Sequence, residues 1–221
     1  MIQRIRNLVS AAQVAQLREL CQRLGMVDGR VTNPDSKVKH NLQVSHEDPA
    51  AAEPGLILRE ALFRHPEVRA FAIPRAMARP TVAAYRPGMN YGWHVDEAMF
   101  PSQPPLRSDI SCTVFLSAPE EYEGGELVIE LGQERMRYKL PAGDAVLYPS
   151  TTIHQVEPVT SGERWVGITW IQSYVADAHR RGLLHQIDEA RALEHARGVD
   201  ARMNVLLESL RTNLFRMWSD A

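Results

Sequence analysis

The sequence predicts a mainly β protein, an antiparallel sandwich or barrel, with helices on either side. From Val68 to Tyr174, short apolar runs alternate with clusters of Pro, Gly, Asn and Asp, as expected for antiparallel strands joined by turns. The segments before and after this region instead carry apolar residues at helical spacing. With 221 residues, 44% of them hydrophobic, the chain is long enough to bury a core. We expect one domain over residues 1–175 and a helical segment over 176–221.

Two helices are predicted near the N-terminus. Ser10 and Gln13 have the spacing of a capping box, so a helix should span residues 11–24 and stop at Gly25. A second helix is expected over residues 50–64, with Pro54 tolerated in its first turn. The side chains available for its packing are Leu56, Leu58, Ala61 and Leu62.

The strands of the central region are predicted from six apolar runs bounded by turn residues. No glycine-rich phosphate-binding loop follows any of them, which argues against a nucleotide-binding fold. The runs are AFAIP (70–74), TVAAY (81–85), CTVFL (112–116), ELVIE (126–130), DAVLYP (144–149) and RWVGITWI (164–171).

The C-terminal segment is expected to form a helical hairpin. Residues 176–197 are rich in Ala, Leu, Arg and Glu, Gly198 interrupts them, and a second helix should begin near Asp200. This hairpin would pack on the β core or join two subunits into a homo-oligomer, and the sequence leaves both open. The second helix carries an apolar stripe of Met203, Leu206, Leu207, Leu210, Leu214 and Trp218.

Charge and composition exclude several classes of protein. A net charge of -2 and the lack of a clustered basic face argue against a nucleic-acid partner. No apolar run is long enough for a membrane span, and the first residues lack the apolar stretch of a secretion signal. Cys21 and Cys112 have no metal-like spacing and are interpreted as buried free thiols. We expect a cytoplasmic protein.

Three residues form a candidate metal site. In an extended chain, His94 and Asp96 of an H-x-D pair project from the same face, because side chains alternate along a strand. His154, which follows a strand and a polar turn, is the candidate for the third ligand. Two histidines and one carboxylate leave coordination positions open and are typical of non-haem iron(II) oxygenases. Zinc more often takes four tetrahedral ligands.

Arg164 is the candidate clamp for a carboxylate. Alternation along residues 164–170 places Arg164, Val166, Ile168 and Trp170 on one face. If that face is interior, the guanidinium needs a partner, either a dicarboxylate or an acidic side chain of the protein. We expect Arg164 on a strand next to that of His154, joined to it by PVTSGE. Tyr85 could donate a further hydrogen bond to the same carboxylate, whereas Tyr91 is interpreted as an aromatic core residue.

These residues form part of a longer pattern that resembles a known family. Tyr85-x-x-Gly88-x-x-Tyr91-x-x-His94-x-Asp96 is followed in order by YEGGEL (122–127), PAGD (141–144), His154 and Arg164. The pattern resembles the PKHD-type hydroxylases of the prolyl 4-hydroxylase-like branch of the 2-oxoglutarate oxygenases. An early Lys39-x-Asn41-x-Gln43 stretch and a C-terminal helix ending near Trp218 extend the likeness over essentially the whole chain.

The resemblance implies a double-stranded β-helix (jelly-roll) core and an iron(II)- and 2-oxoglutarate-dependent dioxygenase that uses O₂. Position by position, His94, Asp96 and His154 match the family's iron ligands and Arg164 its 2-oxoglutarate contact. L-Ascorbate is expected as a reductant. The substrate, a small molecule or a protein side chain, stays open. The alternatives are a peptidyl-prolyl hydroxylase and a non-enzymatic, cupin-like metal-binding or sensing protein.

Two further expectations concern the surroundings of the site. The side chains Lys37, Lys39, Asn41 and Gln43 would share one face of a strand. They would line the substrate entrance and favour an anionic or polar target, or else form a solvated edge strand protected by lysine. Trp93, which precedes the first metal ligand, is expected to narrow the pocket.

Overall fold

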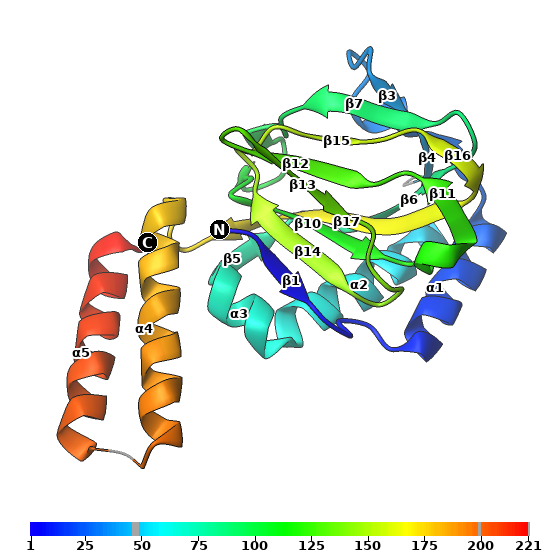
Figure 1. Cartoon of the computed structure of the whole chain (residues 1–221). Coiled ribbons are helices and arrows are strands. Elements are labelled where there is room, and N and C mark those ends of the chain that lie inside the picture. The colour runs from blue at the N-terminus through cyan, green and yellow to red at the C-terminus, as the bar shows by residue number, and fades with distance from the viewer. Residues whose placement is uncertain (46–48, 199, 221) are drawn as a thin grey trace.

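Two facing antiparallel sheets form the body of the protein in a computed structural model that describes residues 1–45, 49–198 and 200–220 (Figure 1). The arrangement is the expected jelly roll with flanking helices. The larger sheet has the order β1 (Gln3–Ile5), β14 (Ala145–Pro149), β10 (Ile110–Phe115), β17 (Arg164–Ser173), β6 (Thr81–Tyr85), β4 (Leu42–Val44) and β2 (Met26–Asp28), with β5 (Pro74–Met77) also paired to β17.

The smaller sheet lies across the barrel from the larger one. Its order is β13 (Glu134–Tyr138), β12 (Leu127–Leu131), β15 (His154–Val156), β7 (Asn90–His94) and β3 (Lys39–His40). Two further sheets have two strands each, β11 (Tyr122–Gly124) with β16 (Val159–Gly162) and β8 (Met99–Phe100) with β9 (Leu106–Arg107).

Three helices cover the outer face of the larger sheet, α1 (Ala11–Leu24), α2 (Ala52–Arg64) and α3 (Pro66–Ala72) (Figure 1). The capping box of Ser10 and Gln13 is present, and Gly25 ends α1 with a φ of 73°, in the left-handed region that glycine tolerates. Short 3₁₀ turns occupy Gly29–Thr32, Pro49–Ala51 and Pro119–Glu121.

Two details of the helical layer differ from the sequence-based prediction. Leu56 is 60% exposed and does not contribute to the packing of α2, whereas Leu58 and Leu62 are buried. The run AFAIP was expected to be a strand, but its first three residues end α3. Pro66 occupies the first turn of that helix, where its missing N–H costs nothing, and starts a helix that apolar alternation does not reveal.

The alternation predicted for β17 is confirmed and separates two apolar cores. Trp165 faces the helices, whereas Val166 faces the space between the sheets. Leu58 of α2 packs so closely on Gly167 that a Cβ there would lie 2.7 Å from Cδ1 of the leucine. The opposite face of β17, which includes Arg164, therefore points into the barrel.

The predicted C-terminal hairpin consists of α4 (Ala178–Ala196) and α5 (Ala201–Trp218), which project from the body (Figure 1). The start of α4 and the end of α5 are both attached near the body. Arg181 donates to the carbonyls of Val175 and Ala176, and Asp220 N–H donates to Tyr174 O. Among the described residues, no helix combines the length and apolarity that a bilayer crossing requires.

Several apolar side chains of the hairpin are exposed. They include three of the six residues of the stripe predicted from the sequence, so half of that stripe is exposed. That a second subunit covers it stays a prediction. The exposed residues are Leu193, Met203, Val205, Leu206, Leu210 and Met217.

Candidate metal centre and co-substrate pocket

The structure brings the three predicted metal ligands together from two adjacent strands. His94 ends β7, His154 begins β15, and the two residues are paired in register. Asp96 follows two residues after His94. One ligand atom from each residue lies within 4.8 Å of the others, which leaves room for one ion between them.

Hydrogen bonds orient both imidazoles toward the acid. Nδ1 of His94 lies 2.8 Å from Gly92 O, and Nδ1 of His154 lies 2.9 Å from Thr152 O. A carbonyl can only accept, so each Nδ1 must carry the proton, and each Nε2 presents a lone pair. Those Nε2 atoms lie 4.0 Å (His94) and 3.7 Å (His154) from the carboxylate oxygens of Asp96. This is the arrangement in which backbone acceptors fix the tautomer of metal-binding histidines.

The surroundings of the cluster act on the charge of His94 and on the orientation of Asp96. Burial, followed by the neighbouring His154, lowers the pKa of His94 to about 4, so this imidazole is neutral at pH 7. Ser111 Oγ of β10 donates to Asp96 Oδ2 and lies 2.9 Å from Ser150 Oγ. Since Ser111 belongs to the larger sheet, this contact fixes the carboxylate against the sheet opposite its own.

Tyr91 packs against the apolar core between the sheets, as interpreted from the sequence, and it also lies at the site. Strict alternation would place it on the face opposite His94. However, the step of three positions from Tyr91 to His94 in β7 is matched by a step of two positions from Val156 to His154 in β15, so β7 carries a bulge. The bulge turns Tyr91 to the inner face, where its ring stacks on the imidazole. A register irregularity of this kind leaves no signal in the apolar pattern.

Arg164 is a buried cation without a partner among the described residues. Its exposed fraction is 1%, and Nε, Nη1 and Nη2 have no hydrogen-bond acceptor there. No ion pair in the described part of the chain includes it, so no acidic side chain among those residues supplies the alternative salt bridge. A buried guanidinium in this state needs an anion, and its planar fork matches a carboxylate.

Aromatic side chains surround that guanidinium. Arg164 Cζ lies 5.0 Å from the ring centroid of Tyr85 and 5.7 Å from that of Phe115. Burial raises the pKa values of the Tyr85 and Tyr122 hydroxyls, while the nearby Arg164 acts in the opposite direction. The Tyr122 hydroxyl is buried without a partner among the described residues. The Tyr122 hydroxyl is therefore a second candidate hydrogen-bond donor to the carboxylate, beside that of Tyr85. The sequence analysis assigned Tyr122 no role.

The predicted placement of Arg164 beside His154 was wrong. His154 belongs to the smaller sheet, and Arg164, paired with Tyr85, belongs to the larger one. The intervening PVTSGE segment is not a tight turn, because part of it forms β16 and pairs with β11. The two side chains nevertheless line one small cavity, of about 50 Å³, from opposite sheets. The barrel thus places the guanidinium across from the metal ligands.

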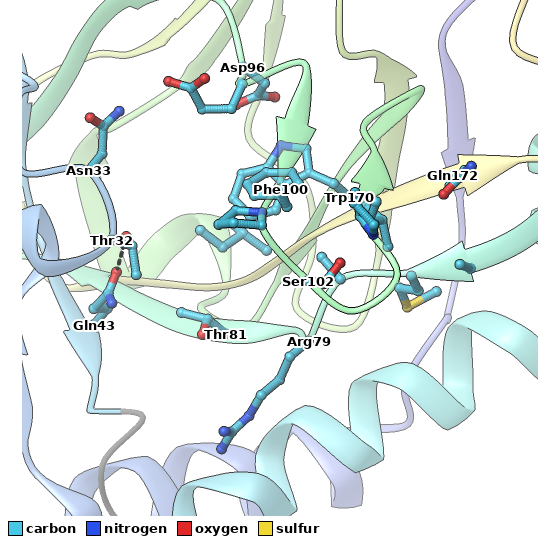
Figure 2. Close-up of a pocket in the computed structure, with 18 of the residues that line it drawn as sticks. Thr32, Asn33, Gln43, Arg79, Thr81, Asp96, Phe100, Ser102, Trp170 and Gln172 are labelled. Atoms are coloured by element: carbon cyan, nitrogen blue, oxygen red, sulfur yellow. Dashed lines mark hydrogen bonds between the residues drawn. The ribbon is translucent and has the colours of Figure 1, made fainter.

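A larger cavity of about 650 Å³ adjoins this site and shares Asp96, Tyr85 and Tyr91 with it. Figure 2 shows polar side chains, including Thr32 and Gln43, on one wall and the rings of Phe100 and Trp170 across from them. The predicted face of Lys39, Asn41 and Gln43 is buried and lines this cavity, so it is not a solvated edge. Lys37, expected with them, is exposed.

Trp93 does not narrow the pocket. Its ring lies on the outer face of β7, 36% exposed, with Arg135 Cζ 4.9 Å from the ring centroid. The wall that Phe100 provides was not foreseen, because the segment 99–106 carries no chemical motif that distinguishes it from an ordinary loop.

Comparison with known proteins agrees with this geometry. Residues 80–172 match the family described as the 2OG-Fe(II) oxygenase superfamily. A PKHD-type hydroxylase of Sphingopyxis alaskensis is 41% identical over 96% of this chain and 97% of its own, and one of Stenotrophomonas maltophilia is 41% identical over the full length of both. A prolyl hydroxylase of Trichoplax adhaerens, solved with a peptide fragment, shares the fold at 14% identity, with a TM-score of 0.61 over 77% of this chain and 82% of that one.

The fold and the site therefore define an iron(II)- and 2-oxoglutarate-dependent oxygenase. Within that class, the chain belongs to the PKHD-type hydroxylases. Iron(II), 2-oxoglutarate and O₂ are accordingly its cofactor and co-substrates, and a purely metal-binding, cupin-like protein is excluded.

Proposed function

We propose that His94, Asp96 and His154 bind the iron(II), and that Arg164 binds the distal carboxylate of 2-oxoglutarate with help from Tyr85. The observation that carries this assignment is the unpartnered guanidinium of Arg164, which lines the same cavity as the three-ligand cluster. A metal-binding barrel that takes no dicarboxylate would have no use for a buried, uncompensated cation at this position.

Bound iron(II) supplies the activation of O₂ that is coupled to decarboxylation of 2-oxoglutarate to succinate and CO₂. The residues of this chain position the reactants. Thr152 O and Gly92 O hold the imidazole tautomers, Ser111 holds the carboxylate of Asp96, and Arg164 fixes the co-substrate at its far end. Apolar side chains between the sheets, among them Val166 and Phe115, keep water away from this end of the barrel.

The substrate that the structure favours is a small molecule. A cavity of about 650 Å³ falls within the range of ~300–1,000 Å³ that small-molecule sites occupy. Peptidyl-prolyl hydroxylation is the alternative. Its support is the likeness to prolyl hydroxylase structures, which at 14% to 18% identity bears on the fold alone.

Two accompanying expectations belong to the same proposal. L-Ascorbate should sustain turnover by keeping the iron reduced, which is tested by counting turnovers with and without it. A cytoplasmic location is supported by the two cysteines, both of which are free and buried, as is usual in reducing compartments.

The residue assignment is tested by replacing the clamp. Arg164→Lys keeps the charge but loses the planar fork, so the KM for 2-oxoglutarate in succinate release should rise about 10- to 100-fold, the equivalent of one lost charged hydrogen bond of ~1.5–3 kcal/mol. Arg86→Lys, at an exposed arginine paired with Glu163, is the matched control and should leave that KM unchanged. An unchanged KM in Arg164→Lys would remove Arg164 from the co-substrate site.

A further inference from the structure

We propose that the large cavity binds a small organic monoanion, with a carboxylate held by Lys39 and an apolar, planar portion held against Phe100 and Trp170. This inference rests on the proposed function, because it names the class of substrate that would reach the iron from this cavity. Lys39 and Phe100 lie outside the small cavity of the metal and co-substrate sites, and Trp170 lines both cavities.

Lys39 is the anchor for the charge. Its side chain is 5% exposed, and its ammonium has one hydrogen-bond acceptor among the described residues, Thr32 Oγ1 at 2.8 Å. An ammonium has three N–H donors, so two remain for a ligand. The nearest aromatic contact is Tyr91, whose ring centroid lies 5.6 Å from Nζ. The described residues provide Lys39 with no ion pair, and burial of an unpaired cation is costly unless an anion joins it.

The polar neighbours of Lys39 indicate how much negative charge the ligand carries. The Thr32 hydroxyl can donate to Gln43 Oε1 at 3.0 Å or to Gly29 O at 3.1 Å, and Asn33 lines the same wall (Figure 2). These groups are uncharged, so one cation faces the ligand, which suits one negative charge. The other cationic residue of the described lining, Arg79, is exposed and extends toward the helices (Figure 2). A phosphate dianion would lack its second cation.

The acidic groups of the cavity do not cancel this preference. Glu97 lines the cavity but is exposed, so water screens its charge. Asp96 also lines it, and as a metal ligand its charge is balanced by the iron. Lys39 is therefore the one buried charge in the described lining that is left for a substrate.

The opposite wall is apolar and aromatic. The ring centroids of Phe100 and Trp170 lie 4.7 Å apart, and their planes are inclined by 44°. The prolines at 101, 104 and 105 and Leu106 extend this surface. Trp170 Nε1 is buried and has no acceptor among the described residues, so it offers one further donor to a polar atom of the ligand. A molecule that is anionic at one end and planar and apolar at the other satisfies both walls.

The test uses matched acids and amides with the full-length protein. Iron(II)-loaded protein is titrated calorimetrically without oxygen with phenylacetate against phenylacetamide, indole-3-acetate against indole-3-acetamide, and phenyl phosphate. Each titration is run with and without 2-oxoglutarate. We expect at least one acid to bind ten times more tightly than its amide, and more tightly than phenyl phosphate. Equal affinity for acids and amides, or a preference for the phosphate, would overturn the proposal.

Variants assign the effect to Lys39. Lys39→Met should abolish the preference for acid over amide while the affinity for 2-oxoglutarate stays unchanged. Lys37→Met, at the exposed lysine of the same segment, should keep the preference. If Lys39→Met weakens 2-oxoglutarate binding instead, the lysine serves the co-substrate and the inference is wrong. If the wild-type protein does not bind 2-oxoglutarate, the proposed function is wrong. The comparison of acids with amides in the absence of 2-oxoglutarate would still test this inference.

Discussion

The ring of Tyr91 lies flat on the imidazole of His94, with centroids 3.6 Å apart and planes inclined by 8°. His154 is 4.2 Å from the same imidazole by ring centroids, on a tilted plane. Contacts with two rings confine His94 more closely than its single hydrogen bond to Gly92 O would. The bulge in β7 is what makes this stack possible.

Removing the stacked ring should loosen the first metal ligand. Tyr91→Leu is expected to weaken metal binding about 10-fold, at the lower end of the effect of residues that orient metal ligands. Tyr91→Phe keeps the ring and should bind metal as the wild type does. Calorimetric titration with Mn²⁺ measures both. Equal affinity of Tyr91→Leu and wild type would show that His94 is held by its backbone contact alone.

Ser111 should act in the same way on the carboxylate. Ser111→Ala removes the hydroxyl that donates to Asp96, so the acid can rotate, and metal affinity is expected to fall by about 10- to 100-fold. Ser117 is a matched buried control. Its hydroxyl donates to Glu163 O and accepts from Trp165 N–H, away from the three metal ligands. Ser117→Ala should lower the melting temperature without changing metal affinity. A parallel loss in both variants would point to a general structural effect.

Gly125 tests the packing around the co-substrate clamp. A Cβ at this residue would lie 2.9 Å from Val159 Cγ2, 3.1 Å from Arg164 Cδ and 3.2 Å from Tyr122 Cε2. Gly125→Ala should therefore displace Arg164 and raise the KM for 2-oxoglutarate.

Gly132 supplies the control for that variant. It has a φ of 64°, close to the 67° of Gly125, but nothing lies within 4 Å of its Cβ position. Both alanine variants incur the backbone strain of ~1 kcal/mol or more that a left-handed residue costs, and only Gly125→Ala should change the KM. The same KM in the two variants would contradict the packing argument.

Both thiols should be unreactive in the folded protein. Burial raises the pKa of Cys21 to about 12 and raises the pKa of Cys112 as well. The thiolate is the reactive form, and a raised pKa keeps each sulfur protonated up to pH values well above 8. A colorimetric disulfide reagent at pH 8 should modify neither thiol in the native protein and both in denaturant. Rapid labelling of one thiol in the native state would show that its part of the core opens readily.

The candidate metal ligands and the carboxylate-binding arginine could be predicted from the sequence because short motifs contain them. His94 and Asp96 are two residues apart, and alternation along β17 places Arg164 inside the barrel without further information. Which strands lie side by side could not be predicted in this way. His154 and Arg164 are close in sequence, yet the chain crosses between sheets in the nine residues that separate them.

Other differences arise where tertiary contacts outweigh local pattern. Leu56 has the spacing of a packing residue, but it is 60% exposed on α2. Tyr91 changes face through a bulge. Phe100 and Trp170 meet from segments 70 residues apart, so the apolar wall of the cavity exists only in the folded chain.

The hairpin of α4 and α5 leaves the body and returns to the same place. Arg107 pairs with Asp220 at 2.8 Å, close to where α4 departs, whereas the far end of the hairpin makes no such contact among the described residues. Helical turns could thus be added to or deleted from both arms together without shifting either anchor. The length of this appendage could therefore change without altering the chemistry inside the barrel.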